Sequence, residues 1–309
     1  WEALIFALVA AITPWIATLF ASSLVGFAIL TLRRDPLAAT WAPQSTQPTN
    51  ARTAIAVAVR NEDFSAVLAR AAPLLDALPA EKFDLWALSD TQDPSLVEVE
   101  QQAWESFVAA RPDPERLHYR RRESNEGFKA GNVMQFLQNH AAPYDFALML
   151  DADSVMTAPK VQMLVRQMAR HPEAALIQTL IAASPSADAF PRLFEFGMRH
   201  GMRAYATGIA WWQGPDGPYW GHNALLRVAA FREHAALPVL PNGQRILSHD
   251  QVEAAMLRTA GHEVRLDPRE GGSYEANPPD MLSFLARDIR WMAGNLQYFA
   301  LLRLPFFRA

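Results

Sequence analysis

The chain has 309 residues, enough for one large domain or two modest ones with a sizeable hydrophobic core. Its 28 Lys and Arg against 32 Asp and Glu leave a net charge of -4, which provides no general positive field, so we expect no nucleic-acid partner. The absence of cysteine removes disulfides, thiolate zinc sites and cysteine nucleophiles from consideration.

Residues 3–32 form a run without a charge, between Glu2 and the pair Arg33 and Arg34. As a helix this run would be about 45 Å long, more than the roughly 30 Å of a bilayer's hydrocarbon core. A signal peptide or a buried core helix is the alternative, but the run is too long for the former and lacks its basic start. We therefore expect a transmembrane helix over residues 1–34. By the positive-inside rule the two arginines place the following domain in the cytoplasm.

The chain does not begin with Met, and it stops just after another apolar run. We expect it to be a piece of a longer membrane protein with further spans. Residues 35–52 contain three prolines among Thr, Gln and Ala, a composition typical of an extended, unpacked linker.

From residue 53 the pattern changes to short β-rich runs that alternate with helical stretches. We expect strands at 53–59, 83–89, 117–119, 146–150 and 176–181, and helices at 64–78, 96–109, 132–140 and 161–170. Farther on we expect a strand within 219–228 and helices at 251–259 and 280–299. This alternation predicts an α/β domain over residues 53–277 with a mostly parallel sheet.

Polar residues follow three of the predicted strands, where open α/β sheets bind their ligands. They are Asn61 and Glu62, then Asp90, then Asp151 and Asp153. The last two form an Asp-x-Asp turn, whose carboxylates suit Mg²⁺ or Mn²⁺ with positions left open for substrate phosphates. A solvated turn or a helix N-cap is the alternative interpretation.

Lys129 precedes the Asp-x-Asp strand beside a glycine, where its ammonium group could reach a diphosphate, and Asn132 is expected to cap a helix. An ordinary exposed lysine is the alternative. The run from Arg120 to Arg122 is more typical of a solvated strand edge than of a phosphate clamp.

The predicted helix 280–299 carries Arg287, Arg290 and Trp291 at i, i+3 and i+4, so they share one face. Two guanidinium groups beside an indole fit phosphates and sugar rings. A packed tryptophan with solvated arginines is the alternative.

Trp220, His222 and Asn223 combine aromatic rings with imidazole and amide donors, as a carbohydrate groove does. A plain hydrophobic wall is an equal alternative. Residues 295–308 are rich in Leu and Phe with two arginines, which predicts a helix lying on the lipid bilayer, or one packed beneath the domain.

The acids and the arginine-tryptophan pair occur in the order of the D, DxD, (T/S)xD and QxxRW signature, so the chain resembles the processive family 2 glycosyltransferases. The members of that signature are Asp90, Asp151, Asp153, Asp250, Arg290 and Trp291. The strings RNED, LDADSVM, YWGHNALLRV, LSHD, GSYEA and RDxRW look most like the glucosyltransferase H family of osmoregulated periplasmic glucan synthesis, from residue 54 to residue 296.

This resemblance implies a GT-A fold, UDP-glucose as donor, a divalent cation, a growing β-glucan as acceptor and the bacterial inner membrane as location. It also implies a β-1,2 linkage and acyl carrier protein as a partner. By the same resemblance Asp90 contacts the uridine end, Lys129 lies near the diphosphate, and Asp151 and Asp153 hold the nucleotide and its metal.

Asp250 takes the place of the general base in this family, Arg290 that of the group on the pyrophosphate, and Trp291 that of the acceptor platform. The acceptor hydroxyl would lose its proton to Asp250 while the departing UDP is neutralised, which predicts inversion at the anomeric carbon. Two residues depart from the family pattern. Arg287 replaces Gln, so we expect a contact to charge there, and Ser154 replaces the His of cellulose synthases, which leaves a third metal ligand open.

Other functions remain open from the sequence. A cellulose-like synthase of the same family is one, a metal-dependent phosphohydrolase using His249 and Asp250 is another, and a non-enzymatic membrane scaffold that senses nucleotide is a third. The acids at strand ends favour the transferase over the hydrolase.

Overall fold

The computed structural model describes residues 1–302. Its strands are β1 (Thr53–Val59), β2 (Phe83–Ser89), β3 (Leu117–Arg121), β4 (Phe146–Asp151), β5 (Val155–Met156), β6 (Ala174–Thr179), β7 (Ala182–Ala183), β8 (Ala224–Arg227), β9 (Glu263–Asp267) and β10 (Ser273–Glu275). Its α-helices are α1 (Glu2–Leu32), α2 (Pro36–Thr40), α3 (Phe64–Ala77), α4 (Pro94–Ala109), α5 (Phe128–Asn139), α6 (Ala158–Arg170), α7 (Ala189–Gln213), α8 (Val228–His234), α9 (Asp250–Thr259), α10 (Met281–Leu296) and α11 (Tyr298–Leu301), with a short 3₁₀ turn at Pro114–Arg116.

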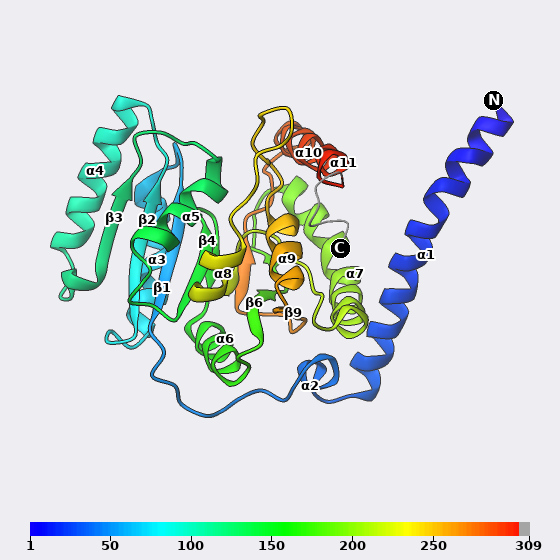
Figure 1. Ribbon diagram of the computed structural model, residues 1–309, viewed down its shortest axis with the longest axis horizontal. Coiled ribbons are helices and arrows are strands. Elements are labelled where there is room, and N and C mark those ends of the chain that lie inside the picture. The colour runs from blue at the N-terminus through cyan, green and yellow to red at the C-terminus, as the bar shows by residue number, and fades with distance from the viewer. Residues whose placement is uncertain (303–309) are drawn as a thin grey trace.

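The central sheet has seven strands in the order β3-β2-β1-β4-β8-β6-β9 (Figure 1). All neighbours are parallel except β8, which is antiparallel to both β4 and β6. This confirms the predicted mixed, mostly parallel α/β architecture. The strand order reverses at β1, so a crevice opens at the carboxyl ends of β1 and β4.

Strand β1 alternates its side chains between two hydrophobic cores, one on each face of the sheet. Ile55 and Val57 pack with residues of α3 and α6. Ala54 and Ala56 pack with residues of α5, α8 and α9 on the other face. Because both faces are covered, the strand is apolar throughout, as a buried parallel strand requires.

The early strands and the helices α9 and α10 lie where the sequence pattern predicted them, whereas the strand near 224 and the start of α5 differ. The strand expected within 219–228 covers only Ala224–Arg227, because Gly221 and Asn223 adopt positive φ angles of 84° and 48° and form a loop. Helix α5 begins at Phe128 after Gly127, so Asn132 lies inside the helix and the prediction that it caps the helix is wrong.

Helix α1 is long and apolar enough to cross a membrane, with a mean hydropathy of 2.2 over its most apolar window, none of which is buried. Residues 1–18 are all exposed, and Figure 1 shows this part of the helix extending away from the domain. A core helix would be buried, so the structure favours the membrane span over that alternative.

The carboxyl-terminal part of α1 packs against α7 through small residues. Gly26 and Gly208 lie at the crossing, and the Trp212 indole N–H donates to Ser22 Oγ at 3.2 Å. The carboxyl-terminal half of α7 is therefore packed against α1.

Residues 35–52 run along the domain and are not unpacked as predicted. Asp35 caps α2, whose Leu37 is buried. The Ser45 backbone N–H donates to Gln167 Oε1 at 2.9 Å, so the extended segment is fastened to α6. The reason is that Leu37 and polar side chains of α6 supply contacts that composition alone does not reveal.

Candidate active site

The Asp-x-Asp turn lies at the end of β4, at the crevice of the sheet. Asp151 is the last residue of the strand and forms an ion pair with Lys129 of α5. His222 approaches it from the loop before β8, with Nδ1 3.7 Å from Asp151 Oδ2. The other ring nitrogen of His222 lies 2.6 Å from Glu275 Oε2 of β10. The end of β4, helix α5, the loop before β8 and strand β10 thus come together at this site.

Gly221 marks the point at which Asp250 joins this group. A Cβ placed on Gly221 would lie 3.7 Å from Asp250 Cβ, 3.8 Å from His249 Cε1 and 3.8 Å from Lys129 Nζ. The structure therefore brings Asp250, at the start of α9, into the same cleft as Lys129 and its partner Asp151. A Cβ would make only ordinary contacts at these distances, so glycine is favoured at this position by its φ of 84°.

The acids of this cleft carry more negative charge than the neighbouring cations neutralise. Burial and the carboxylates of Asp151 and Glu275 raise the pKa of Asp153. Burial and the charge of Asp153 likewise raise the pKa of Glu62. For Asp151 burial alone would raise the pKa, but Lys129 and His222 outweigh it and lower that pKa.

A divalent cation fits this donor set. In the part of the chain that the structure describes, no three His, Asp or Glu side chains form a complete ligand set. Asp151 and Asp153 nevertheless offer carboxylate oxygens in an acidic cleft whose excess charge a cation would relieve. With only two protein ligands, the remaining positions would be left to phosphate oxygens and water, which is how Mg²⁺ is commonly held.

A second histidine, His249, which the sequence reasoning placed only in the alternative phosphohydrolase site, lies beside Asp250. His249 Nδ1 is 2.8 Å from Glu253 Oε2, and Glu253 is almost fully buried. Burial alone would lower the pKa of His249, but the Glu253 carboxylate raises it. The i, i+4 spacing of this pair was a signal that could have found it, whereas Glu275 joins His222 only through the tertiary fold.

The donor-side residues predicted on β1 and β2 lie at the same edge of the sheet. Asn61, with a φ of 59°, donates its backbone N–H to Thr91 Oγ1 at 2.9 Å, which ties the two loops together. Asp90 is buried and accepts two hydrogen bonds from Arg122, at 2.6 and 2.7 Å. The prediction of a solvated arginine run is wrong for Arg122, because it is needed to neutralise a buried carboxylate.

Arg120 and the backbone of β2 hold the side chain of Asn132 inside the fold. Its side-chain amide donates to the Leu88 carbonyl at 3.0 Å, and its oxygens accept from Arg120. Arg120 is therefore also a structural residue of the β2–α5 contact and not part of a solvated edge.

The acceptor-side residues predicted near 220 separate into different surroundings. Asn223 is fully buried, and its amide donates to Ser273 Oγ at 3.0 Å and to the Tyr274 carbonyl at 3.1 Å. The predicted acceptor contact of Asn223 is therefore wrong, because its side chain holds the small sheet β5-β10-β7 to β8. Trp220 is half-buried against α7, and His222 faces Asp151.

Helix α10 carries Arg287, Arg290 and Trp291 beside α7. The guanidinium of Arg287 lies 4.3 Å from the ring centre of Trp291, 5.4 Å from that of Phe284 and 5.9 Å from that of Phe194 on α7. Arg287 thus covers one face of the Trp291 indole, which remains 51% exposed. We expected Arg287 to contact charge. Its guanidinium lies 3.5 Å from Asp288 and within an aromatic cage.

The end of α10 is bonded to the loop that leads into Asp250. The Leu247 backbone N–H donates to Gln297 Oε1 at 2.8 Å, and the Tyr298 hydroxyl donates to the Ser248 carbonyl at 3.1 Å. Gly294 lies so close to Ser248 that a Cβ there would be 2.1 Å from Ser248 Oγ. The helix carrying Trp291 and the loop carrying Asp250 therefore form one packed unit.

Comparison with known proteins places these features in a family. The model of the glycosyl transferase family group 2 matches residues 146–308. The glucans biosynthesis glucosyltransferase H of Rhodopseudomonas palustris (strain BisA53) is 40% identical, over 98% of this chain and 43% of its own. The protein of the same name from Vibrio cholerae (strain ATCC 39541, serotype O1) is 39% identical, over 92% of this chain and 40% of its own. The chain thus spans less than half the length of these curated relatives.

Among solved structures, the mannosyltransferase PcManGT from Pyrobaculum calidifontis, in complex with GDP-Man and Mn²⁺, resembles this chain with a TM-score of 0.59. The match covers 92% of this chain and 74% of that one, at 17% identity, and so concerns the fold alone. It supports the GT-A type of α/β fold predicted from the sequence.

Proposed function

The chain belongs to the glycosyl transferase family group 2, and from this membership we propose that it transfers glucose from UDP-glucose to a growing β-glucan at the bacterial inner membrane. One observation carries the proposal: Asp250, Lys129 and the Asp-x-Asp turn share one cleft around Gly221. A base and a phosphate-binding group must lie on either side of the same anomeric carbon, and this cleft offers both.

We place the donor along the carboxyl ends of the parallel strands. The nucleoside lies toward Asn61, Glu62 and Asp90, and the diphosphate lies toward Lys129. Lys129, which pairs with Asp151 in the described structure, would then also bind the phosphates. A divalent cation held by Asp151 and Asp153 would act as a Lewis acid on the phosphate oxygens, and the Mn²⁺ complex of the mannosyltransferase supports such an ion.

Transfer proceeds by a single displacement. The acceptor hydroxyl gives its proton to Asp250 as its oxygen forms a bond to the anomeric carbon. The bond from that carbon to the UDP oxygen breaks, and its electron pair leaves with UDP. Lys129 and Arg290 stabilise the charge that develops on the leaving group. Attack opposite to the departing UDP inverts the anomeric configuration.

We place the acceptor glucan on the exposed face of Trp291. Its other face is covered by Arg287, so a sugar ring can stack on only one side. We place Trp220 and His222, on the loop before β8, on the acceptor side as well, nearer the Asp-x-Asp turn. Because the Trp291 helix is bonded to the Asp250 loop, the stacked sugar and the base keep a fixed relation.

The membrane side of the proposal is supported by exposed apolar residues. Helix α1 meets the length and composition of a span, and α10 with α11 exposes a row of large apolar side chains: Leu282, Leu285, Ile289, Met292, Leu296 and Phe299. Of this row only Leu296 and Phe299 lie in the segment 295–308 for which we predicted an interfacial helix, so the exposed apolar face belongs mainly to α10. Residues 303–308 of that prediction lie outside the described part. A cytoplasmic location of the domain rests on Arg33 and Arg34 at the end of α1. The β-1,2 linkage and acyl carrier protein as partner rest on the resemblance to the relatives.

The test is incubation of the chain in membranes with UDP-glucose, with and without Mg²⁺ or Mn²⁺, followed by linkage analysis of the product. Polymer together with UDP supports the transferase, and a β-1,2 rather than β-1,4 linkage separates the periplasmic glucan backbone from a cellulose-like product. Release of phosphate without glycan would support the hydrolase. Nucleotide binding without transfer to any acceptor would support the scaffold.

A further inference from the structure

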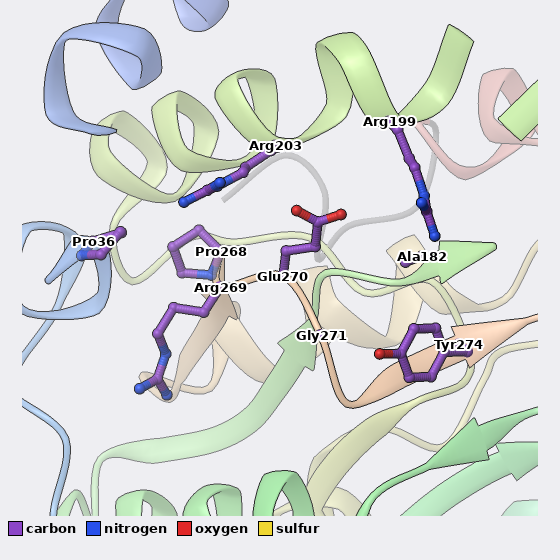
Figure 2. Close-up of a pocket in the computed structure, with 9 residues that line it drawn as sticks. All are labelled: Pro36, Ala182, Arg199, Arg203, Pro268, Arg269, Glu270, Gly271 and Tyr274. Carbon is purple, nitrogen blue, oxygen red and sulfur yellow. The ribbon is translucent and has the colours of Figure 1, made fainter. Parts of the chain in front are cut away.

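A basic cavity of about 440 Å³ lies between α7 and the loop that leads into β10. Figure 2 shows Arg199 and Arg203 extending into it from α7, on either side of the Glu270 carboxylate. The other lining residues are Pro36, Ala182, Pro268, Arg269, Gly271 and Tyr274.

The two α7 arginines differ in how they are neutralised. Arg199 pairs with Glu195 at 2.8 Å on the same helix. For Arg203 no carboxylate lies within ion-pair distance among residues 1–302. Glu270 stands between the two guanidinium groups but forms no ion pair with either in this part of the chain.

The loop side of the cavity carries a further positive charge. Lys160 and Arg269 both pair with Asp267, at 2.8 and 2.9 Å. Asp267 is buried and neutralises one of these two cations, so together with Arg203 two positive charges stand against the single carboxylate of Glu270. The cavity is therefore suited to an anion with several oxygen acceptors, since arginines bind phosphate through paired N–H groups.

The cavity lies close to the end of the apolar helix. Pro36, which lines it, comes four residues after Leu32, the last residue of α1. Those four residues span at most about 14 Å even when fully extended, and they include Arg33 and Arg34. If α1 crosses the bilayer, the cavity opens at the level of the headgroup phosphates of the cytoplasmic leaflet.

We infer that this cavity binds a phosphate ester, that of an anionic phospholipid headgroup. Basic pockets beside membrane helices on the cytoplasmic side bind such headgroups. The ligand phosphate would lie between Arg199 and Arg203, where Glu270 now stands. Glu270 can turn away, because among residues 1–302 neither an ion pair nor a hydrogen bond holds its carboxylate in place. The inference goes beyond sugar transfer and rests on the membrane placement of α1.

The experiment measures lipid binding and not transfer, so its result is independent of the proposed activity. The full chain is reconstituted in nanodiscs of phosphatidylcholine with or without one-fifth phosphatidylglycerol, and bound lipid is counted by native mass spectrometry. Four proteins are compared: wild type, Arg203→Ala, Glu270→Gln and the control Arg192→Ala. Arg192 is an exposed arginine of the same helix outside the cavity, so its removal matches the loss of charge.

Wild type should retain phosphatidylglycerol selectively, and Arg203→Ala should lower its affinity about tenfold, the scale of one charge-assisted contact. Glu270→Gln should raise the affinity, because a competing carboxylate is removed. A gain in affinity cannot come from misfolding, so this variant keeps the test decisive even if Arg203→Ala fails to fold. Arg192→Ala should bind as wild type does.

A second arm adds glycerol 3-phosphate to the chain in phosphatidylcholine alone. Binding there that depends on Arg203, with equal strength to the lipid, would overturn the lipid source in favour of a soluble phosphate ester. Equal losses in Arg203→Ala and Arg192→Ala, or no change in Glu270→Gln, would overturn the site.

Discussion

Gly208 of α7 lies against the backbone oxygen of Ser22 in α1, and a Cβ on Gly208 would be 1.8 Å from that oxygen. The contact is reciprocal, since a Cβ on Gly26 would be 1.7 Å from the Ala204 carbonyl oxygen. The two helices approach so closely that neither glycine admits a side chain. Small residues that let helix backbones meet are the usual basis of such crossings near membranes.

We predict that Gly208→Leu separates α1 from α7 and lowers the stability of the chain in detergent by about 2 kcal/mol or more, the scale of overpacking a close contact. Thermal unfolding and protease cleavage between α1 and the domain would report the change. Gly201→Ala is the control, because nothing lies within 4 Å of a Cβ there. It should match or exceed wild type. Wild-type stability of Gly208→Leu would mean that the crossing is not formed in the membrane.

We predict that Asp250→Asn lowers glucose transfer at least about a hundredfold, as loss of a general base does. UDP binding, measured by calorimetry, should remain nearly unchanged, because the proposed function assigns the diphosphate to Lys129 and the Asp-x-Asp turn and not to Asp250. Asp76→Asn, at an exposed carboxylate, serves as the control. Wild-type turnover of Asp250→Asn would remove this residue from the mechanism.

We predict that Arg287→Gln, which introduces the residue of the family signature, loosens α10 from α7. Each contact of a cation with an aromatic face contributes about 0.5–1 kcal/mol or more, and Arg287 contacts three rings. Stability should fall by about 1–2 kcal/mol and the Trp291 fluorescence should shift toward that of a solvated indole.

Arg287→Lys should keep part of this stability, and Arg232→Gln, at an exposed arginine elsewhere, should keep all of it. If Arg287→Gln leaves stability and fluorescence unchanged but weakens acceptor use, Arg287 contacts the acceptor directly, and its aromatic contacts are incidental.

We predict that Asp267 stabilises the fold and that this contribution to stability is lost in acid. Burial alone would raise its pKa, but Lys160 and Arg269 outweigh burial and hold the pKa below its ordinary 3.8. Since the folded state has the lower pKa, this carboxylate stabilises the fold above pH 3.8, and the contribution is lost as the pH falls from there through the folded pKa.

At neutral pH Asp267→Asn should therefore be less stable by about 3–5 kcal/mol, because it leaves buried Lys160 unpaired. The gap from wild type should shrink below pH 3.8, as followed by urea unfolding at several pH values. Asp188→Asn, at an exposed position, should show no such gap. A gap that is constant with pH would contradict the charge-based account.

Much of the fold follows from local patterns, because the strands β1, β2, β4 and β6 are apolar runs bounded by polar residues. The acids at their ends were predicted for the same reason. Arg122 and Asn223 were misjudged because polar residues look solvated in a sequence, and only the fold shows that one neutralises a buried acid and the other ties strands together.

The partners of each residue in the cleft could not be predicted, because they come from contacts between distant parts of the chain. Glu275 reaches His222 across 53 residues of chain, and Arg287 meets Phe194 of α7 from a helix that begins far downstream. Such pairs arise from the packing of distant elements, so a sequence pattern can suggest that each residue is reactive but not which partner it has.

Two neighbouring residues of strand β10 belong to two different charged sites. Tyr274 lines the arginine cavity, and the next residue, Glu275, holds His222 beside the Asp-x-Asp turn. A ligand in the arginine cavity that displaces β10 would alter the affinity of the Asp-x-Asp site for the sugar nucleotide. Thermodynamic reciprocity then requires the sugar nucleotide to alter the affinity of the cavity for its ligand by the same factor. The concentration of the sugar nucleotide and the lipid composition of the surrounding leaflet would then be coupled through this one strand.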